Sequence, residues 1–288
     1  MKATFFSANT VRFATGAGVM AAALCAMSPG SAAAATLVST ELVLSVDVSG
    51  SISPSEFNLQ QDGYVAAFRD ADLISQIESL SNGIAVSLVY WSTSAVKAVD
   101  WFHITDSASS NTFADQIEAA DRPRGIGSST DIAEGIDLSV FELLNNEFDG
   151  ANLVIDVSGD GTDNSGGAVT DARDAAAAED IIINGLPILT SSSSILSDYY
   201  TNNVITNDGF IEVASGFENF ENAVKTKIGR EIAPPDDPTP PDDPTPPDDP
   251  TPPDNPTPPG DPVSVPDPTA VLGLVAVGLL GLRSKFRQ

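Results

Sequence analysis

Short apolar runs alternate with amphipathic segments between residues 41 and 231. The clearest run is Glu41–Asp47, which is apolar over most of its length and ends at an acidic residue, as a buried parallel strand does. This alternation predicts an α/β fold with a doubly wound, mostly parallel sheet and helices on both faces. Further strands are predicted at Gly83–Trp91, Val96–Phe102, Leu153–Val157, Ile181–Ile188 and Phe210–Val213, with Val96–Phe102 as an antiparallel edge strand.

The predicted helices lie between these strands and begin with recognisable signals. Ser53-Pro54-Ser55-Glu56 supplies an N-cap, a proline at the first helical position and an acidic first turn. Apolar residues follow at helical spacing, which predicts one inward face for this helix. The other helices are predicted at about Asn111–Ala120, Asp131–Leu144, Val169–Glu179 and Phe217–Ile228.

The N-terminus, residues 1–35, has the pattern of a secretory signal peptide. Lys2 and Arg12 precede an apolar stretch from Phe13 to Met27, and Ser31–Ala35 offers small residues for cleavage. The single cysteine, Cys25, lies in this segment, so the mature chain is expected to have no disulfide. Lipidation of Cys25 is the alternative, and Ala22 in place of leucine three residues earlier disfavours it.

Residues 233–263 form a linker of hexapeptide repeats rich in Pro, Asp and Thr. Proline fixes φ and removes a backbone donor, so neither a helix nor a sheet is expected. At about 3.1 Å per residue, an extended polyproline II spacer of this length reaches roughly 90 Å. A proline-motif ligand is the alternative, which the aspartates around each proline pair disfavour.

Residues 264–288 contain three features in order: Pro266-Asp267-Pro268, an apolar run from Thr269 to Leu282, and a basic end from Arg283. The arrangement resembles the PEP-CTERM sorting signal of Gram-negative bacteria, with Asp267 where that motif has glutamate. The resemblance implies transient membrane anchoring through the apolar helix, processing by an exosortase, and delivery to the outer surface or extracellular matrix. The alternative is a plain C-terminal membrane anchor.

The chain carries 40 acidic and 13 basic residues, a formal net charge of -27. Such a surface repels phosphate backbones, so nucleic acid is not an expected partner. A solvated acidic surface is favoured over a cation-storage role.

Three polar loops follow predicted strands or precede a predicted helix. They are Asp47–Ser51, Gly127–Asp131 and Ser158–Gly161, and all of their side chains are hard oxygen donors. In doubly wound sheets, ligands bind at the carboxyl ends of the strands. The loops therefore predict a site for a divalent cation, most readily Mg²⁺, with Mn²⁺ or Ca²⁺ as alternatives to it, and not for Zn²⁺.

This pattern of Asp-x-Ser-x-Ser, a distant threonine and a distant Asp-Gly resembles the metal-ion-dependent adhesion site (MIDAS) of von Willebrand A domains. The resemblance covers about Glu41 to Glu231, within a domain predicted at residues 36–232, and is greatest to a bacterial subgroup described only as a domain of unknown function. It implies that Ser49 and Ser51 bind the metal directly and that Thr130 binds directly or through water. Asp47 and Asp160 would act mainly through water, and a partner's carboxylate would complete the coordination.

Residues near these loops have simpler expected roles. Asp131 is predicted to oppose the dipole of the helix that it precedes. Asp156 could hydrogen-bond the metal-site loops from within its strand. Arg122 and Arg124 could steer an acidic partner or lie in a solvated loop. Asp163 and Asn164 are predicted to lie at the rim of the site.

The sequence does not predict an enzyme. His103, the only histidine, lies on the predicted edge strand away from the three loops, and no nucleophile with an adjacent base is evident. Metal-assisted hydrolysis with Asp47 and Asp160 is the weaker alternative. The expected function is metal-dependent binding of a carboxylate-bearing protein or matrix polymer, and the alternative is a structural surface component without a specific ligand.

Overall fold

A computed structural model describes residues 34–190 and 194–233. The predicted signal peptide lies almost entirely outside the described residues, and the repeat linker and sorting signal do so apart from Ala233. The chain divides into two units, Met1–Asp237 and Pro238–Gln288, and only the first contains described residues. Within the described ranges, no helix has the length and apolar character needed to cross a membrane.

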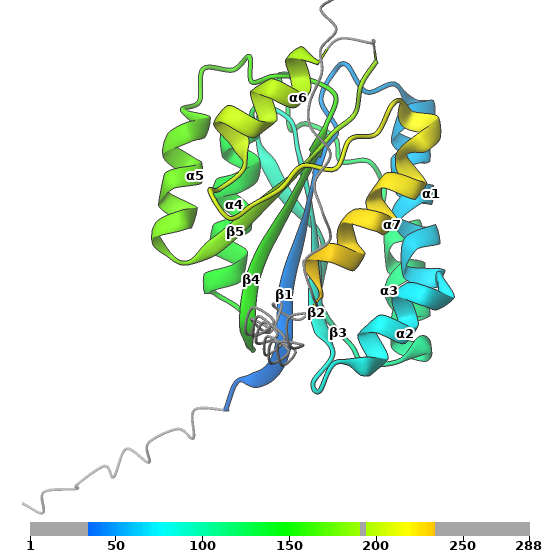
Figure 1. The fold of residues 1–288 in the computed structure, drawn as a ribbon. Coiled ribbons are helices and arrows are strands. Elements are labelled where there is room, and N and C mark those ends of the chain that lie inside the picture. Colours follow the sequence, from blue (N-terminus) through cyan, green and yellow to red (C-terminus); the bar gives the residue numbers. More distant parts are fainter. Residues whose placement is uncertain (1–33, 191–193, 234–288) are drawn as a thin grey trace, which may run out of the picture. The chain divides into compact units, whose positions relative to one another are not determined.

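The described unit is built on one five-stranded sheet with the order β3-β2-β1-β4-β5 (Figure 1). β1 runs parallel to both of its neighbours and β4 runs parallel to β5, whereas β3 pairs antiparallel with β2 at the edge. The predicted fold class is therefore confirmed. The strands are β1 Thr36–Asp47, β2 Ile84–Trp91, β3 Ala95–Ile104, β4 Phe148–Gly159 and β5 Ile181–Pro187.

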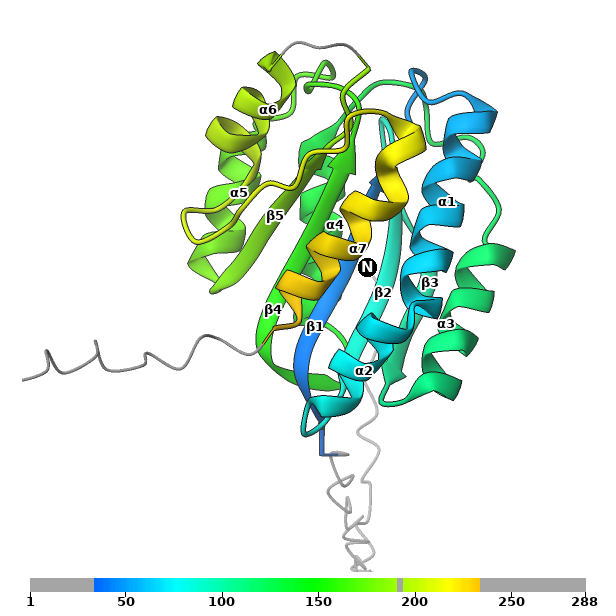
Figure 2. The same ribbon diagram turned by 45° about the vertical axis from the view of Figure 1, so that its right-hand side comes forward.

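Helices cover both faces of the sheet (Figures 1 and 2). One face carries α1, α2, α3 and α7, and the other carries α4, α5 and α6. Their bounds are α1 Pro54–Arg69, α2 Ala71–Ser79, α3 Ser107–Ala119, α4 Ile132–Leu144, α5 Val169–Ala178, α6 Ile195–Tyr199 and α7 Phe220–Glu231. A π-helical turn, Tyr200–Val204, continues α6, and a 3₁₀ turn, Phe217–Asn219, precedes α7.

The start of α1 is fixed by its own sequence. The Ser53 hydroxyl accepts a hydrogen bond from the Glu56 amide at 3.3 Å, and the Ser53 amide donates to Glu56 Oε2 at 2.8 Å. This capping box confirms the predicted N-terminus. The sequence interpretation missed α2, although Asp70 caps it by accepting from the amides of Asp72 and Leu73.

The sheet separates two apolar cores. On the α1 and α7 face, Tyr64 contacts Phe220 with ring centroids 5.3 Å apart, and Phe68 contacts Phe113 at 4.8 Å. The residues packed on the opposite face include Val43, Trp91, Ile136, Ile155 and Tyr200. Because both faces of the central strands are buried, β1 and β2 are apolar on both sides, as the sequence indicated.

The predicted strand at Phe210–Val213 was wrong. This segment forms only two isolated bridges to β5, between Gly185 and Ile211 and between Ile188 and Ala214. Ala214 donates to the Pro187 carbonyl at 3.1 Å, but Pro187 has no amide hydrogen to donate in return. The proline therefore interrupts the ladder that a sixth strand would need.

Candidate metal site at the carboxyl ends of β1 and β4

The five predicted site residues meet at one edge of the sheet. Asp47 ends β1, Asp160 directly follows β4, and Thr130 lies two residues before α4. β1 and β4 are neighbours, and the chain leaves them toward opposite sides of the sheet. This is the topological switch point at which doubly wound sheets form a crevice for ligands.

Hydrogen bonds connect the five residues into one cluster. The Ser49 amide donates to Asp47 Oδ1 at 2.7 Å, and the Ser49 and Ser51 hydroxyls lie 3.1 Å apart. Ser51 donates to Asp160 Oδ1 at 2.7 Å, and Thr130 Oγ1 donates to Ser49 Oγ at 3.3 Å. Three hydroxyls and two carboxylates from three separate loops thus converge, as the sequence predicted.

The cluster is buried on one side and open on the other. Asp47, Ser49 and Thr130 are buried, whereas Ser51 is exposed and Asp160 is partly buried. A partner or solvent can therefore approach only from the side of Ser51 and Asp160.

The electrostatics of the cluster are unbalanced. Asp47 Oδ2 is buried without a hydrogen-bond partner, and no ion pair among the described residues includes Asp47 or Asp160. Burial raises the pKa of Asp47 to about 7, against the opposing effect of the Ser49 amide. Burial also raises the pKa of Asp160. Both shifts express the cost of holding negative charge here without a cation.

The residues present fit a small divalent cation. The donor set consists of hydroxyl and carboxylate oxygens, which hard cations prefer, and the orphaned Asp47 Oδ2 is a buried acceptor without a donor. Within residues 34–190 and 194–233, no group of three or more His, Cys, Asp or Glu side chains is arranged to hold a metal. A cation at this edge would therefore depend on Ser49, Ser51 and Thr130 as well as on the two carboxylates.

Arg122 holds the first loop in place. Its Nη2 donates to the carbonyls of Val48 and Ser49, at 2.8 and 3.0 Å. The sequence left open whether Arg122 steers a partner or lies free in a loop. These contacts instead give it a structural role, because they fix the backbone on which Ser49 is carried.

Asn164 holds the second loop. Its Oδ1 accepts from the Thr130 amide at 2.9 Å, and its Nδ2 donates to Thr130 Oγ1 at 3.3 Å. The sequence placed Asn164 only at the rim, because nothing local links it to Thr130. Asp131 has the role predicted for it: it caps α4 by accepting from the Glu134 amide at 3.2 Å.

Two functional features gave no recognisable signal in the sequence. A Cβ added to Gly159 would lie 3.0 Å from Asp47 Oδ2 and 2.8 Å from the Tyr200 hydroxyl, so only glycine fits at this position. Tyr200 comes from the π-helical turn, is fully buried, and its hydroxyl has no partner. The contact between Gly159 and Tyr200 does not follow from sequence spacing, since α5, β5 and α6 intervene between them.

Asp156 does not bond the metal-site loops. It lies 2.8 Å from Lys227 of α7, which also pairs with Glu231, and all three side chains are fully buried. We call Asp156, Lys227 and Glu231 the buried charge cluster. Burial raises the pKa of both carboxyls, and Lys227 opposes the rise.

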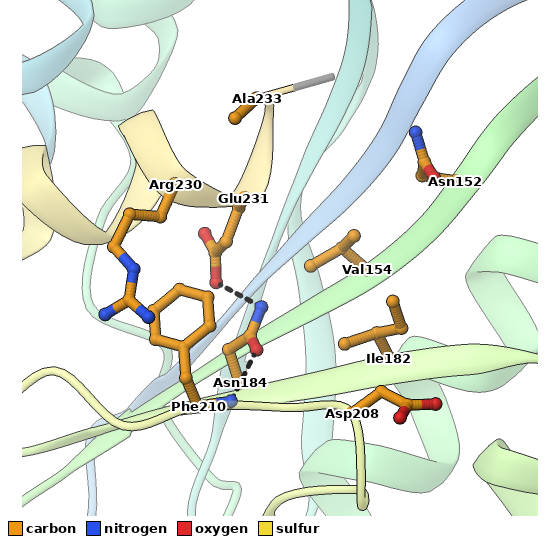
Figure 3. A pocket seen from close by; sticks show the side chains of 9 residues that line it. All are labelled: Asn152, Val154, Ile182, Asn184, Asp208, Phe210, Arg230, Glu231 and Ala233. Carbon is orange, nitrogen blue, oxygen red and sulfur yellow. Dashed lines mark hydrogen bonds between the residues drawn. The ribbon is translucent and has the colours of Figure 1, made fainter. Parts of the chain in front are cut away.

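A cavity of about 280 Å³ borders this cluster near the start of β5 (Figure 3). Asn184 links the cavity wall to the cluster by donating to Glu231 Oε1 at 3.1 Å and accepting from the Phe210 amide at 3.0 Å. Arg230 lies over the Phe210 ring, 3.6 Å from its centroid. Asn184 thus connects Glu231 to the backbone of Phe210 across the cavity wall.

His103 lies on β3, away from the candidate metal site. Its Nε2 is 2.8 Å from the Asn82 carbonyl, and its ring packs 5.8 Å from that of Phe148. These contacts give the histidine a structural place on the edge strand.

The comparison with solved structures found matches of low sequence identity. Proximal thread matrix protein 1 from the mussel byssus is 15% identical, with a TM-score of 0.50 over 69% of this chain and 47% of that chain. The same mussel protein with a zinc-occupied MIDAS motif is 17% identical, with a TM-score of 0.47 over 66% of this chain and 46% of that chain. A von Willebrand factor type A protein from Catenulispora acidiphila is 10% identical, with a TM-score of 0.48 over 67% of this chain and 42% of that chain. This chain spans less than half of each of these, and the likeness concerns the fold alone.

The sheet order, the antiparallel edge strand and the helices on both faces define a doubly wound α/β domain. The model of the family described as "Protein of unknown function (DUF1194)" matches residues 37–236, and the chain belongs to this family. A comparison with curated proteins found no match.

Proposed function

We propose that this chain is an exported, surface-anchored binding protein whose von Willebrand A-like domain uses a divalent cation, Mg²⁺ in the first place, to bind a carboxylate. The observation that carries the proposal is the open cluster of Asp47, Ser49, Ser51, Thr130 and Asp160, with its orphaned buried carboxylate oxygen. Hydroxyl ligands leave the charge of a cation only partly neutralised, so a further anionic ligand is favoured.

The ligand is proposed to be a protein or an extracellular matrix polymer that bears a carboxylate. The net charge of -27 repels polyanions at long range, so the attraction has to come from the cation itself. The Ser51 hydroxyl donates to the Asp160 carboxylate, but His103 lies away from this site on β3, and we propose a binding protein and not an enzyme.

Export and surface anchoring rest on the two ends of the sequence. Residues 1–35 have the pattern of a signal peptide, and Pro266-Asp267-Pro268 with the following apolar run resembles a sorting signal read by an exosortase. Both are proposals about segments outside the described residues, apart from Ala34 and Ala35.

Binding of the purified full chain to carboxymethyl-dextran, with unmodified dextran as the matched surface, tests this proposal. We expect retention on carboxymethyl-dextran in Mg²⁺, release by EDTA, and no retention of Asp47→Ala. Calorimetric titration of Mg²⁺ alone tests the cation separately. Equal and negligible heats of Mg²⁺ binding for the wild type and Asp47→Ala would show that the assignment of the metal site is wrong. Binding of Mg²⁺ without retention on carboxymethyl-dextran would support the proposed cation site but contradict the proposed carboxylate ligand.

A further inference from the structure

Two buried polar atoms face the same point beside the candidate metal site, and neither has a partner. Asp47 Oδ2 lies 3.0 Å and the Tyr200 hydroxyl 2.8 Å from the position that a Gly159 side chain would occupy. One atom is an acceptor and the other can donate. Buried polar groups without partners are rare, because each has lost its hydrogen bonds to water.

The structure assigns Tyr200 as a positioning residue of the metal site: its hydroxyl donates a hydrogen bond to Asp47 Oδ2 in the cation-loaded domain. This inference rests on the proposed function, because it concerns the same site. Asp47 Oδ1 is already held by the Ser49 amide at 2.7 Å, so a donor to Oδ2 would fix the second oxygen and the plane of the carboxylate.

The backbone around Tyr200 is adapted to this position. The short helix α6 ends at Tyr199, and the chain then widens into a π-helical turn in which the Ile205 amide donates to the Tyr200 carbonyl at 3.1 Å. Such turns are uncommon and occur frequently at functional sites. The ring is fully buried beside β5, where a Cβ on Gly185 would lie 2.8 Å from Tyr200 Cδ1.

Glycine at position 159 makes the approach possible. Any larger residue would place atoms between the hydroxyl and the carboxylate. The glycine ends β4 directly before Asp160, so the same turn that presents Asp160 also admits Tyr200 to Asp47. The two atoms border the same position beside Gly159, and the bond would form when the cation fixes the Asp47 carboxylate.

Tyr64 provides a matched control. It is also fully buried, but it lies on the opposite face of the sheet, and its hydroxyl is 3.2 Å from Ser158 Oγ. Tyr200→Phe therefore removes a hydroxyl without a partner, and Tyr64→Phe removes a bonded one. In EDTA we expect Tyr200→Phe to unfold at the same temperature as the wild type or higher, and Tyr64→Phe to unfold at a lower temperature.

Calorimetric titration of Mg²⁺ into the full chain is the main test. We expect Tyr200→Phe to bind about tenfold more weakly than the wild type, because it loses a hydrogen bond to a charged group. Tyr64→Phe should bind within about twofold of the wild type, since its hydroxyl contacts Ser158 and none of the five proposed site residues. A tyrosine that begins to donate to a carboxylate also changes its near-ultraviolet absorption. We expect Mg²⁺ to produce this difference spectrum in the wild type and Tyr64→Phe but not in Tyr200→Phe.

The outcomes separate this inference from the function on which it rests. Mg²⁺ binding by the wild type with equal affinity in Tyr200→Phe would overturn only the role of Tyr200. The same conclusion would follow if Mg²⁺ left the wild-type tyrosine spectrum unchanged, a measurement that needs no variant. Failure of the wild type to bind Mg²⁺ or Mn²⁺ would overturn both the proposed metal site and this inference.

Discussion

Asp47 ends β1 and Asp156 lies within the adjacent strand β4, and both side chains are fully buried. Asp156 lies 2.8 Å from the Lys227 ammonium group. Asp47 meets a backbone amide and neighbouring hydroxyls, and its second oxygen has no partner. The chain thus supplies an internal cation to one buried aspartate and none to the other.

The difference separates a structural use of buried charge from a functional one. Asp156 already has a cation inside the protein, the Lys227 ammonium group, and therefore needs none from outside. A buried carboxylate without a cation destabilises the fold, and such an arrangement is typical of sites that gain their partner from outside. The position of Asp47 beside exposed Ser51 agrees with this interpretation.

Removal of the internal cation should have the largest effect. Lys227→Met leaves Asp156 and Glu231 buried without a cation, and we expect a loss of about 3–5 kcal/mol in the free energy of unfolding, measured in urea. Lys225→Met on the same helix is the control, because Lys225 is only partly buried and pairs with Asp70 near the surface. A Lys227→Met chain as stable as Lys225→Met would contradict the importance of the buried pair.

Removal of the unpaired carboxylate should act in the opposite direction. Asp47→Asn keeps the shape and can still accept from the Ser49 amide, so in EDTA we expect stability equal to the wild type or higher. Mg²⁺ at a hundred times its dissociation constant should stabilise the wild type by about 2.7 kcal/mol and leave Asp47→Asn unchanged. Asp115→Asn, at an exposed position on α3, should respond like the wild type. Equal Mg²⁺ stabilisation of Asp47→Asn would exclude Asp47 from the site.

The pH dependence of stability should report the same imbalance. The pKa of Asp47 rises from an ordinary 3.8 to about 7 on folding, so between these values the folded chain keeps a proton that the unfolded chain has lost. Stability of the metal-free chain should therefore fall as pH rises from 5 to 7, by about 1.4 kcal/mol per pH unit for this group. Urea unfolding of the wild type and Asp47→Asn in EDTA, repeated between pH 5 and 7, measures the slope of stability against pH for each chain. Identical slopes for the two chains would contradict the shift at Asp47.

The smallest effect is expected at the residue that supports the first loop. Arg122→Lys keeps the charge but cannot reproduce both bonds to the Val48 and Ser49 carbonyls, because it lacks the guanidinium fork. We expect Mg²⁺ affinity to fall about threefold, as for the loss of one ordinary hydrogen bond. Arg124→Lys, at an exposed neighbouring position, is the control. An unchanged affinity in Arg122→Lys would show that the loop holds its shape alone.

The sequence predicted the features that depend on local pattern. The buried strands, the N-cap at Ser53 and the loop that follows β1 are each contained in a short segment, so composition and spacing are enough to identify them. The segment 210–213 is apolar like a strand, but Pro187 on the neighbouring strand prevents regular pairing. That error came from examining one segment without its partner.

The contacts of Asp47 and Asp156 with distant side chains could not be predicted from local sequence patterns. Lys227 reaches Asp156 and Tyr200 approaches Asp47 only because the sheet order brings distant segments together. One sign was present: Lys227 lies among the apolar residues of its predicted helix, on the face that contains Val224 and Ile228. No comparable sign marked Tyr200, which lies outside every predicted strand and helix.

The sheet order also has a consequence for the time course of folding. β1 is the first strand to be synthesised, yet it lies at the centre of the sheet, and its longest pairing is with β4, at residues 148–159. Parallel pairing across such a sequence separation is slow, because a large loop must close before the contacts form. β2 can pair with one edge of β1 early, but the other edge must stay unpaired until more than half of the chain has been made. An exposed strand edge of this kind favours aggregation while the chain folds.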